Sequence, residues 1–591
     1  MTTRNFRILE QGMLPPVGVG VNVSLENREW ARLTTLFCRS AAFLLSIGNE
    51  PRTYRTGPRY ACLWHGHLGR GVLTGTPVPQ QSATTEAVPS PNLAYAILAL
   101  DQPRAVYFPR DLCEETQTKG GLMESDSKVN RRDFLRAGIS SSASLAALGG
   151  ISVLPERVWG ANDRVRMAVV GVRGQGGEHL KGFGTVPDAE IAAICDIDDS
   201  VISKRLGDMA TWNLPKPQVY KDIRKLLEDK SIDAISVATP NHWHSLMGIW
   251  ACQAGKDAYV EKPCSHGWWE GHQLVAAARH YDRIVMHGTQ GRSAEGYIEG
   301  VRKLREGVIG DVYLSRGLCF KWRDTIGIAK VEPTPAGVDY DLWTGPAPLK
   351  PFTRNRFHYN WHWIWDTGNG DVGNQGVHEM DLARWALGVG FPNKISATGG
   401  HVMFKDDQET PNILNCSFEY DMPDETRRVL EFEVRHWMSN TEADIGLPGF
   451  GAGAAALPET AGHIHIQQPK AMCGNLIYGT KGYMAMTGYE SYRTFLGEDN
   501  EPGPSATRSG DRWANFIHCV RTRKKEDIPA PIEEGHITAT LIHLANTSYR
   551  LGRTLKFDPV NQRVMGDEEA NRYLRGEDRG FREPFTIPEK V

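Results

Sequence analysis

Short apolar runs alternate with segments of helical periodicity between residues 163 and 290. The runs are "VRMAVVGV", "AEIAAICDI", "DAISVATP", "DAYVEKP" and "RIVMHGT". Strands that alternate with helices predict a parallel sheet with helices packed on both faces. We therefore expect an α/β domain with a doubly wound parallel sheet over residues 163–290.

The pattern changes after residue 290. Longer strands with mixed polar and aromatic residues follow, such as "GDVYLSRGLCFKW", "NILNCSFEYD" and "RRVLEFEVRHW". Such strands are typical of an antiparallel sheet with one packed face and one open face. Residues 291–557 are therefore expected to form an α+β domain with a large, mostly antiparallel open sheet. Residues 558–591 are expected to form a charged tail.

The segment "NRFHYNWHWIWD" spaces Trp361, Trp363 and Trp365 as on a strand. Exposed on a pocket wall, these side chains could stack on pyranose rings, whereas buried they would belong to a core. We favour core packing, because aromatic side chains carry large burial energies in any fold. The strand-like spacing also argues against a helical metal pair formed by His358 and His362.

Residues 130–155 combine Arg131 and Arg132 with a weakly apolar stretch rich in Ser, Ala and Gly. This pattern resembles a twin-arginine export signal, and the stretch is too short and too polar to span a bilayer comfortably. We therefore predict a signal and linker over residues 123–162. The mature protein is expected in the periplasm or outside the cytoplasm, with no stable membrane span after processing.

The segment before the expected signal shows no sustained helical or strand periodicity. Because export signals lie at chain starts, we expect translation to begin at Met123. Residues 1–122 are then disordered or a mis-assigned upstream extension. The alternative is a genuine N-terminal domain, with the arginine pair as a chance match.

Composition narrows the possible partners. The net charge is −3, the isoelectric point is near 6.7, and the sequence has no long basic run, so we do not expect a nucleic-acid partner. The ten cysteines include no C-x-x-C pair, which argues against a zinc cluster and against a disulfide scaffold. We expect mostly buried free thiols.

A glycine-rich turn follows the first predicted strand. Gly171, Gly174 and Gly176 precede a predicted helix, whose N–H groups and dipole would face a pyrophosphate. Arg173 occupies the second glycine position of the usual G-x-G-x-x-G pattern, and Gly174 could take over its role. Asp196 lies twenty residues beyond Gly176, where an acid binds the ribose hydroxyls, which favours NAD over NADP. The alternative is a purely structural strand-to-helix turn.

Glu261 and Lys262 end another predicted strand of the parallel sheet. Ligands of open parallel sheets collect at the carboxyl ends of the strands, so we expect both side chains to face a cofactor crevice. The alternative is an ordinary turn with a solvated lysine. His242, His244 and His266 include an H-x-H spacing without a neighbouring pair of acids, which is weak evidence for zinc, so no metal is expected.

Two strand-end motifs, "TPNHWH" and "EKP", together with the glycine turn resemble the Gfo/Idh/MocA oxidoreductases, in particular their exported members with a twin-arginine signal. The resemblance spans residues 163–557. Other segments that carry it are "GTQGRS" at 288–293, "GNGDVGNQGVHEMDLARW" at 368–385, "NLIYGTKGYM" at 475–484 and "HLANTSYRLGRTL" at 543–555. It implies a Rossmann-type NAD-binding domain followed by a substrate and oligomerisation domain.

The resemblance also implies roles for individual residues. Lys262 would lie beside the nicotinamide and hydrogen-bond the substrate hydroxyl, and Glu261 would hold the nicotinamide ribose. The Lys-Pro bond after Glu261 is often cis in the family. The expected contacts on the nicotinamide side are Pro240, Asn241 and His244.

His378 matches the catalytic histidine of the resembled family. Many relatives have an aspartate four residues earlier, where this chain has Asn374. An amide can orient a sugar hydroxyl but cannot take its proton, so proton abstraction would fall on His378 and Lys262, unless Asp371 or Asp381 substitutes. With an ordinary pKa near about 6.5, His378 could act as a base near neutrality. The alternative is a structural histidine.

Together, these expectations predict that the protein is an NAD-dependent oxidoreductase. It would transfer a hydride between a tightly bound nicotinamide cofactor and a sugar, polyol or related secondary alcohol or ketone. Two alternatives stay open: an NAD-assisted glycosidase that uses transient oxidation, and a non-catalytic carbohydrate-binding protein that retains the fold. We expect a homo-oligomer that forms through the C-terminal sheet.

Overall fold

The computed structural model describes residues 163–440, 442–443, 445 and 471–591. All of them belong to the second of the two compact units into which the chain divides, Val129–Val591. The expected export signal at 123–162 and the segment 1–122 lie outside the described residues. Among the described helices, none combines the length and apolar character needed to cross a bilayer.

Six parallel strands form the first sheet, in the order β3-β2-β1-β4-β5-β6. The chain changes direction across the sheet between β1 and β4, and such a switch point is where open α/β sheets bind ligands. This order confirms the predicted Rossmann-type domain. The strands are β1 (Val165–Val170), β2 (Ala189–Cys195), β3 (Gln218–Tyr220), β4 (Ala234–Val237), β5 (Asp257–Val260) and β6 (Val285–His287). The helices are α3 (Gln175–Thr185), α4 (Asp199–Thr211), α5 (Ile223–Glu228), α6 (Asn241–Gln253) and α7 (Trp268–His280).

Separate apolar cores cover the two faces of this sheet. On one face, Leu180 of α3 and Phe516 of α12 (Arg512–Thr522) pack in a buried cluster with Val169. On the other face, Leu246 of α6 packs in a cluster with Ile235 of β4. Because strand residues alternate between the two faces, each strand contributes to both cores.

Ten strands form the second sheet, in the order β14-β13-β12-β11-β7-β10-β9-β8-β15-β16. Neighbours are antiparallel except for the parallel pair β7 and β10, so the prediction of a mostly antiparallel sheet is confirmed. The strands are β7 (Val312–Lys321), β8 (Lys394–Gly400), β9 (Ile413–Asp421), β10 (Arg427–His436), β11 (Ala471–Gly479), β12 (Gly482–Thr487), β13 (Ser491–Leu496), β14 (Glu501–Thr507), β15 (Leu555–Asp558) and β16 (Arg563–Val564).

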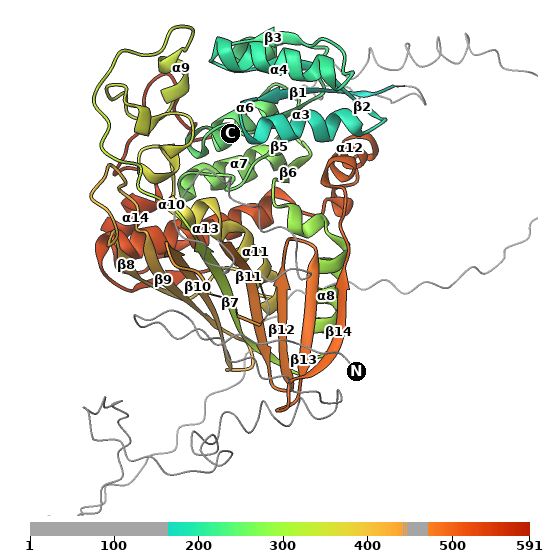
Figure 1. Ribbon diagram of the computed structural model, residues 1–591, viewed down its shortest axis with the longest axis vertical. Coiled ribbons are helices and arrows are strands. Elements are labelled where there is room, and N and C mark those ends of the chain that lie inside the picture. Colours follow the sequence, from blue (N-terminus) through green and yellow to red (C-terminus); the bar gives the residue numbers. More distant parts are fainter. Residues whose placement is uncertain (1–162, 441, 444, 446–470) are drawn as a thin grey trace, which may run out of the picture. The chain divides into compact units, whose positions relative to one another are not determined.

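Helices α11 (Gly376–Leu387) and α13 (Ile532–Leu551) cover one face of the second sheet (Figure 1). Met380 of α11 and Leu541 of α13 share a buried cluster with Phe418 and Phe432 from the strands. Glu431 alternates with these core residues along β10 and is exposed on the opposite face. The remaining helices are α8 (Glu295–Arg305), α10 (Gly370–Asn374), η2 (Gln290–Ser293) and η5 (Lys525–Asp527).

Residues 322–369, which connect β7 to α10, form a segment that we call the cap segment. It contains α9 (Tyr340–Thr344), η3 (Arg354–Arg356) and η4 (Asn360–Trp363). The segment is attached to the first domain, because Val338 forms a β-bridge with Asp198 and the Asp339 N–H donates to the Ile197 carbonyl at 3.0 Å. Its aromatic cluster, which packs on Ile197, consists of Trp343, Phe352, Phe357 and Trp361.

The tryptophan-rich part of the cap segment is not a strand. It folds into the 3₁₀ helix η4 and a following turn, in which the Thr367 hydroxyl donates to the Trp361 carbonyl at 2.9 Å. The favoured core packing holds for Trp361 and Trp363, which are 8% and 4% exposed. Trp365 is half-buried beneath the Arg550 guanidinium, 5.0 Å from the ring centroid. Local turns prevail because none of the described strands pairs with this segment.

The segment after residue 558 differs from the expected charged tail. It contains β16 and α14 (Glu568–Leu574), and its last part buries Phe585 and Ile587 in the core of the first domain. The Gln273 side chain also donates to the Pro588 carbonyl at 2.6 Å. The apolar residues that anchor this segment are isolated among charged ones, so the sequence pattern concealed them.

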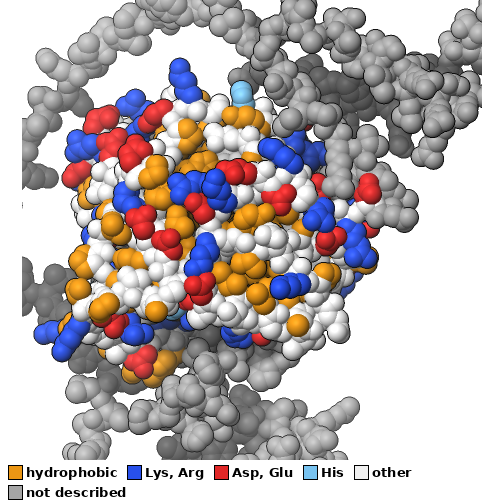
Figure 2. Space-filling model, turned by 90° about the horizontal axis from the view of Figure 1, so that it is seen from above, with side chains coloured by type: hydrophobic (Ala, Val, Ile, Leu, Met, Phe, Trp, Pro, Cys, Tyr) orange, Lys and Arg blue, Asp and Glu red, His pale blue; other side chains and the backbone are white. Residues whose placement is uncertain are grey.

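Basic and acidic side chains lie interspersed on the face of the molecule that Figure 2 shows. The described residues on this face therefore form no continuous basic surface that would attract a polyanion. The expectation that nucleic acid is not a partner stays a prediction.

Candidate active site

A cavity of about 340 Å³ opens at the carboxyl ends of the parallel strands. Its volume falls within the range of small-molecule and cofactor sites, about 300–1,000 Å³. The predicted site residues that line it are Gly171, Gly174, Asp196, Pro240, Asn241, His244, Glu261, Lys262 and Asn374. The cap segment contributes Trp343, Phe357, His358, Tyr359, Trp361 and His362 to its wall. Two predicted site residues, Gly176 and His378, do not line this cavity.

The glycine turn after β1 has one position with space for a side chain, Gly174, and one position without such space, Gly176. A Cβ on Gly176 would lie 1.9 Å from the Gly171 carbonyl oxygen, so Gly176 allows α3 to pack closely on β1. Gly174, the residue before α3, has no atom within 4 Å of its Cβ position. Because α3 has no side-chain cap at this end, its first N–H groups can bind an anion in the cavity.

Asp196 follows β2 and lines the same cavity. The backbone N–H groups of Val172 and Asp198 donate to its two carboxylate oxygens, at 2.8 and 3.2 Å. Burial raises the pKa of Asp196 to about 6, although the two N–H groups oppose this shift. A carboxylate oriented in this way at the end of the second strand suits the hydroxyls of a ribose.

Glu261 ends β5 in a buried polar cluster. Its Oε1 lies 3.1 Å from His179 Nε2 and accepts a hydrogen bond from the Gln175 amide at 3.3 Å. Its Oε2 accepts the Lys262 backbone N–H at 3.0 Å. Burial alone would raise the pKa of Glu261, but His179 and the Lys262 ammonium reverse the effect and hold the pKa well below its ordinary value. Glu261 is therefore ionised and keeps a fixed orientation beside the cavity.

Lys262 connects the two domains. Its Nζ donates to the backbone carbonyl of Asn374, the last residue of α10, at 2.7 Å. Burial lowers the pKa of Lys262, and the Glu261 carboxylate opposes this change. The Lys262–Pro263 bond is cis, as the family resemblance led us to expect. A lysine with a lowered pKa, whose ammonium group is held by a carbonyl, is a candidate for proton transfer.

The residues expected on the nicotinamide side lie at the start of α6. Pro240 precedes the first residue of this helix, and the Asn241 side chain donates to Asn369 of the cap segment at 3.0 Å. The ring nitrogens of His244 lie 2.6 and 2.7 Å from carbonyl oxygens in the turns after β5 and β4. His244 therefore links the two turns that carry Lys262 and Pro240.

Asn374 presents its backbone to Lys262 and directs its side chain elsewhere. The side-chain N–H donates to Asp371 at 2.9 Å. Asp371 is 1% exposed, accepts hydrogen bonds from Arg323 at 2.9 Å on each oxygen, and lies 2.7 Å from His436 Nε2. Despite burial, Arg323 and His436 hold the pKa of Asp371 well below its ordinary value. Asp371 is thus a saturated counter-ion and does not replace the missing base.

His378 lies in the first turn of α11, beside a second cavity of only about 10 Å³. Its ring packs edge-on against Tyr489, with centroids 4.9 Å apart. Burial, followed by the charge of Lys262, lowers the pKa of His378 well below its ordinary value. The expectation of an unperturbed pKa near 6.5 is therefore wrong. The imidazole is neutral at pH 7 and can accept a proton, but it is a weaker base than expected.

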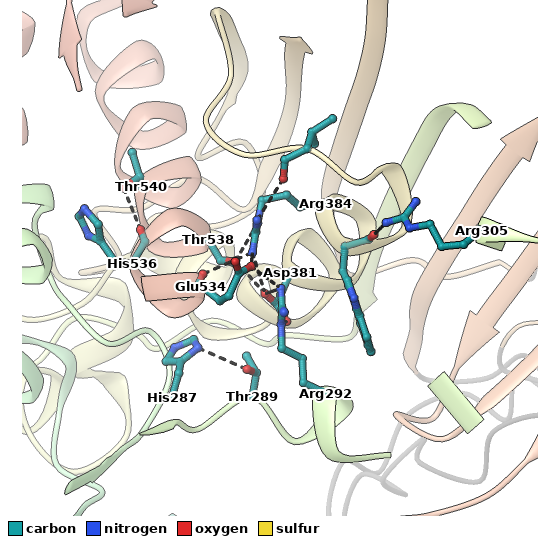
Figure 3. A network of polar contacts seen from close by, with 12 residues as sticks. His287, Thr289, Arg292, Arg305, Asp381, Arg384, Glu534, His536, Thr538 and Thr540 are labelled. Atoms are coloured by element: carbon teal, nitrogen blue, oxygen red, sulfur yellow. Dashed lines mark hydrogen bonds and ion pairs between the residues drawn. The ribbon is translucent and has the colours of Figure 1, made fainter. Parts of the chain in front are cut away.

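A buried ion network holds α11 in place (Figure 3). Asp381 accepts two hydrogen bonds from Arg292, at 2.8 and 3.0 Å, and one from the Thr538 hydroxyl at 2.8 Å. Arg292 also donates to Glu534 at 3.1 Å. Although burial opposes it, Arg292 lowers the pKa of Asp381 to about 2. Asp381 therefore anchors the helix that carries His378 and is not a base.

The described residues contain no group of His, Cys, Asp and Glu side chains that could hold a metal ion. The histidines with suggestive spacing have other partners. His242 Nε2 lies 3.1 Å from the Trp343 carbonyl oxygen, and His266 Nε2 lies 2.9 Å from that of Trp365. These histidines attach the first domain to the cap segment.

Three features of the site were not predicted from the sequence: Arg323, His436 and the wall formed by the cap segment. Arg323 follows β7 and His436 ends β10, and the two strands are parallel neighbours. Each of these polar residues lies at the carboxyl end of a strand, and this position can be recognised in the sequence once the strands are assigned. The contact with Asp371, however, depends on long-range packing.

The chain belongs to the Gfo/Idh/MocA oxidoreductase family. Residues 165–289 match the oxidoreductase family with an NAD-binding Rossmann fold, and residues 283–401 and 488–587 match its C-terminal alpha/beta domain. NAD is therefore the cofactor of this fold, and the open position at Gly174, the α3 N-terminus and the Asp196 carboxylate fit a dinucleotide. The matched regions agree with the predicted order of the two domains.

Curated relatives include the glycosyl hydrolase family 109 proteins of Shewanella pealeana and of Shewanella sp. strain W3-18-1. They are 31% and 29% identical over 206 and 203 residues. Each alignment covers 31% of this chain and 44% of the relative, so the chain matches less than half of their length.

Similar solved structures include an aldose-aldose oxidoreductase from Caulobacter crescentus (TM-score 0.49, 16% identity, 67% of this chain and 100% of that one). A levoglucosan dehydrogenase complexed with NADH and levoglucosan has a TM-score of 0.47 and 14% identity, over 67% of this chain and 99% of the other.

Proposed function

We propose that this protein is an NAD-dependent oxidoreductase that acts on a secondary alcohol or ketone of a sugar or polyol. The position of Lys262 carries the proposal. Its side chain lines the cavity at the edge of the parallel sheet, beside the ionised Glu261, and bonds to a carbonyl of the second domain. A substrate oxygen bound beside Lys262 would lie next to its positive charge, which supports the proposed role.

Residues along the strand ends would hold the dinucleotide. The N–H groups at the start of α3, next to Gly174, would bind the pyrophosphate, and Asp196 would accept hydrogen bonds from one ribose. Glu261 would accept hydrogen bonds from the other ribose. When bound, NAD supplies the nicotinamide ring that accepts or returns the hydride.

Lys262 and His378 would handle the proton and the charge on the substrate oxygen. The Lys262 ammonium would stabilise negative charge on that oxygen, and the neutral His378 would accept the proton. Because Lys262 lines the main cavity and His378 lines a separate, smaller one, Lys262 is the first candidate for direct contact with the substrate. Asn374 supports this role through its carbonyl.

The cap segment supports a tightly held cofactor. Its aromatic residues form one wall of the cavity and also pack on Ile197 next to Asp196. If the protein is exported through the twin-arginine route, it would carry NAD out of the cytoplasm in the folded state and reuse it in place. Turnover would then alternate between two alcohol or carbonyl substrates.

Mass spectrometry of the purified protein tests this proposal. We expect bound nicotinamide dinucleotide, and a change at the nicotinamide absorbance when the protein is mixed with a panel of sugars and polyols. If the cofactor is bound but no sugar or polyol changes its absorbance, the proposed dehydrogenase activity would be contradicted. The alternative of a non-catalytic carbohydrate-binding protein would then be favoured. If the gently purified protein contained no nicotinamide dinucleotide, the proposal that it keeps its cofactor tightly bound would be contradicted.

A second candidate function is an NAD-assisted glycosidase, favoured by the similarity to glycosyl hydrolase family 109 proteins. Transient oxidation of a sugar would permit elimination of its substituent, and the same hydride would then return. Release of a chromophore from aryl glycosides, with no net change in NADH, would support this function. Release that requires added NAD and accumulates NADH would contradict it.

We also propose that the second sheet forms a homo-oligomer through its exposed face, where Glu431 and its neighbours project. Light scattering after size-exclusion chromatography would give the mass directly. A monomer at micromolar concentration would contradict the proposal.

A further inference from the structure

Cys319 of β7 and Cys473 of β11 lie directly opposite each other in the antiparallel ladder. Both are free thiols, and they share the apolar cluster beneath α11. Each thiol influences the pKa of the other. Cys319 is fully buried, whereas Cys473 is partly exposed.

The ladder brings the two sulfurs to a spacing that a disulfide can bridge. Directly opposed residues of antiparallel strands have Cα atoms about 4.5–5.5 Å apart, inside the range of about 4.4–6.8 Å seen in disulfides. Their Cβ atoms are about 4.5–5.5 Å apart and disulfides need about 3.5–4.5 Å, so the strands must approach slightly. A bridge that requires such an adjustment is more easily reduced than a relaxed structural disulfide.

Cys473 differs in reactivity from the other cysteines of the described residues. The hydrogen bond from Cys319, and then the positive charge of Lys321, lower the pKa of the Cys473 thiol although burial opposes them. The thiolate is the nucleophile in disulfide exchange, so Cys473 is the expected attacking group. Burial raises the thiol pKa of the other described cysteines, namely Cys195, Cys252, Cys264, Cys319, Cys416 and Cys519.

We propose that Cys319 and Cys473 are a redox-active pair that closes and reopens a cross-strand disulfide by exchange with low-molecular-weight disulfides. The Cys473 thiolate attacks one sulfur of glutathione disulfide, which forms a mixed disulfide and releases one glutathione. The Cys319 sulfur then attacks the Cys473 sulfur and releases the second glutathione. Two cysteine thiols lose two electrons and two protons, and one glutathione disulfide becomes two glutathione thiols.

The pair lies next to the segment that holds the candidate active site. Lys321, two residues after Cys319, donates a hydrogen bond to the Gln375 side chain. Gln375 directly follows Asn374, whose carbonyl binds Lys262. Two hydrogen bonds and short stretches of chain thus lie between the pair and Lys262. Formation of the disulfide does not depend on the proposed enzymatic function.

Incubation of the folded, reduced protein with glutathione disulfide tests the proposal. Intact mass spectrometry should show the loss of two hydrogen atoms, and non-reducing peptide mapping should join the peptides of Cys319 and Cys473. Dithiothreitol should restore the original mass. A mass that does not change, or a bridge between two other cysteines, would overturn the proposal.

Single variants separate the two chemical steps. Cys319→Ser should stop at the mixed disulfide and carry one glutathionyl group on Cys473, whereas Cys473→Ser should form neither product. Cys416→Ser is the matched control, because Cys416 is buried on the same face of the sheet, and it should behave like the parent protein. If the serine variants fail to fold, timed alkylation of the parent protein with peptide mapping still tests the proposal. Among the seven cysteines that the structure describes, Cys473 should react first, and equal labelling of these seven would contradict the proposal.

Discussion

Asp196 and Glu261, at strand ends of the first domain, and the aspartates Asp371 of α10 and Asp381 of α11 have different partners. Asp371 and Asp381 each accept two hydrogen bonds from one arginine. Asp196 accepts only backbone N–H groups among the described contacts, and none of the hydrogen bonds of Glu261 comes from an arginine. Burial is therefore common to both pairs of acids, whereas hydrogen bonds from arginine are made only to Asp371 and Asp381.

This difference assigns separate tasks to the two regions. A carboxylate that is paired with an arginine has its oxygens occupied by the arginine N–H groups. Its charge offsets the free-energy cost of burying the arginine. A carboxylate oriented by neutral donors keeps acceptor capacity for a ligand. The strand-end acids and Lys262 thus belong to binding and chemistry, and Asp371 and Asp381 belong to architecture.

Replacement of Lys262 by Met tests the role assigned to the strand-end residues, and it should have the largest effect on turnover. The variant keeps the shape of the side chain but loses the charge, so turnover should fall about 10²- to 10⁴-fold while bound NAD stays at the parent level. Steady-state kinetics and the nicotinamide content after denaturation measure the two quantities. If turnover is unchanged, Lys262 has no part in the mechanism; if NAD is lost as well, the lysine holds the cofactor.

Asp371→Asn should have the largest effect on stability. It leaves the buried Arg323 without its counter-ion, which costs about 3–5 kcal/mol in the free energy of unfolding. Urea unfolding followed by fluorescence measures the loss. The matched control is Asp421→Asn, because Asp421 and its partner Arg427 are both 58% exposed and such pairs contribute less than about 1 kcal/mol. Equal losses in the two variants would remove the distinction between architectural and surface acids.

The strand-end residues could be predicted from the sequence because their signals are local. Asp196, Glu261 and Lys262 each follow an apolar run, and the carboxyl ends of parallel strands meet at one edge. The partners of Asp371 could not be predicted in this way. Arg323 is 48 positions away and His436 is 65, so only the packing of β7 and β10 brings them together.

The position of His378 shows a further limit of sequence reasoning. Its motif predicted the residue and its helix, but not that it lines a smaller cavity separate from the main one. Its lowered pKa follows from burial and from Lys262, a residue of the other domain. The cap segment was missed for a similar reason, because its tryptophans have strand-like spacing while its turns satisfy the backbone locally.

Asp196 should give the first domain a characteristic pH dependence. Its pKa is about 6 in the folded protein and near 3.8 when unperturbed, so the protonated form favours folding. Its contribution is complete below about pH 4 and is lost as the pH rises through about 6, by up to about 3 kcal/mol. Unfolding free energies from pH 4 to 7 should fall less with rising pH in Asp196→Asn than in the parent. Parallel profiles would contradict a raised pKa.

The glycine turn after β1 also contains one structural position, Gly176, and one position that faces the expected ligand, Gly174. Gly176→Ala should destabilise the fold by about 1–3 kcal/mol, because its Cβ would approach the Gly171 carbonyl oxygen to 1.9 Å and α3 would have to move. Gly174→Ala meets no atom within 4 Å, so its stability should change by less than about 1 kcal/mol. The new methyl would instead occupy the space near the α3 N-terminus, where the pyrophosphate is expected, and should lower the NAD content of the purified protein. Thermal unfolding together with NAD content separates the two variants. If Gly174→Ala kept its full NAD content, the phosphates would not lie at this turn, and the division between ligand-facing and structural positions would fail here.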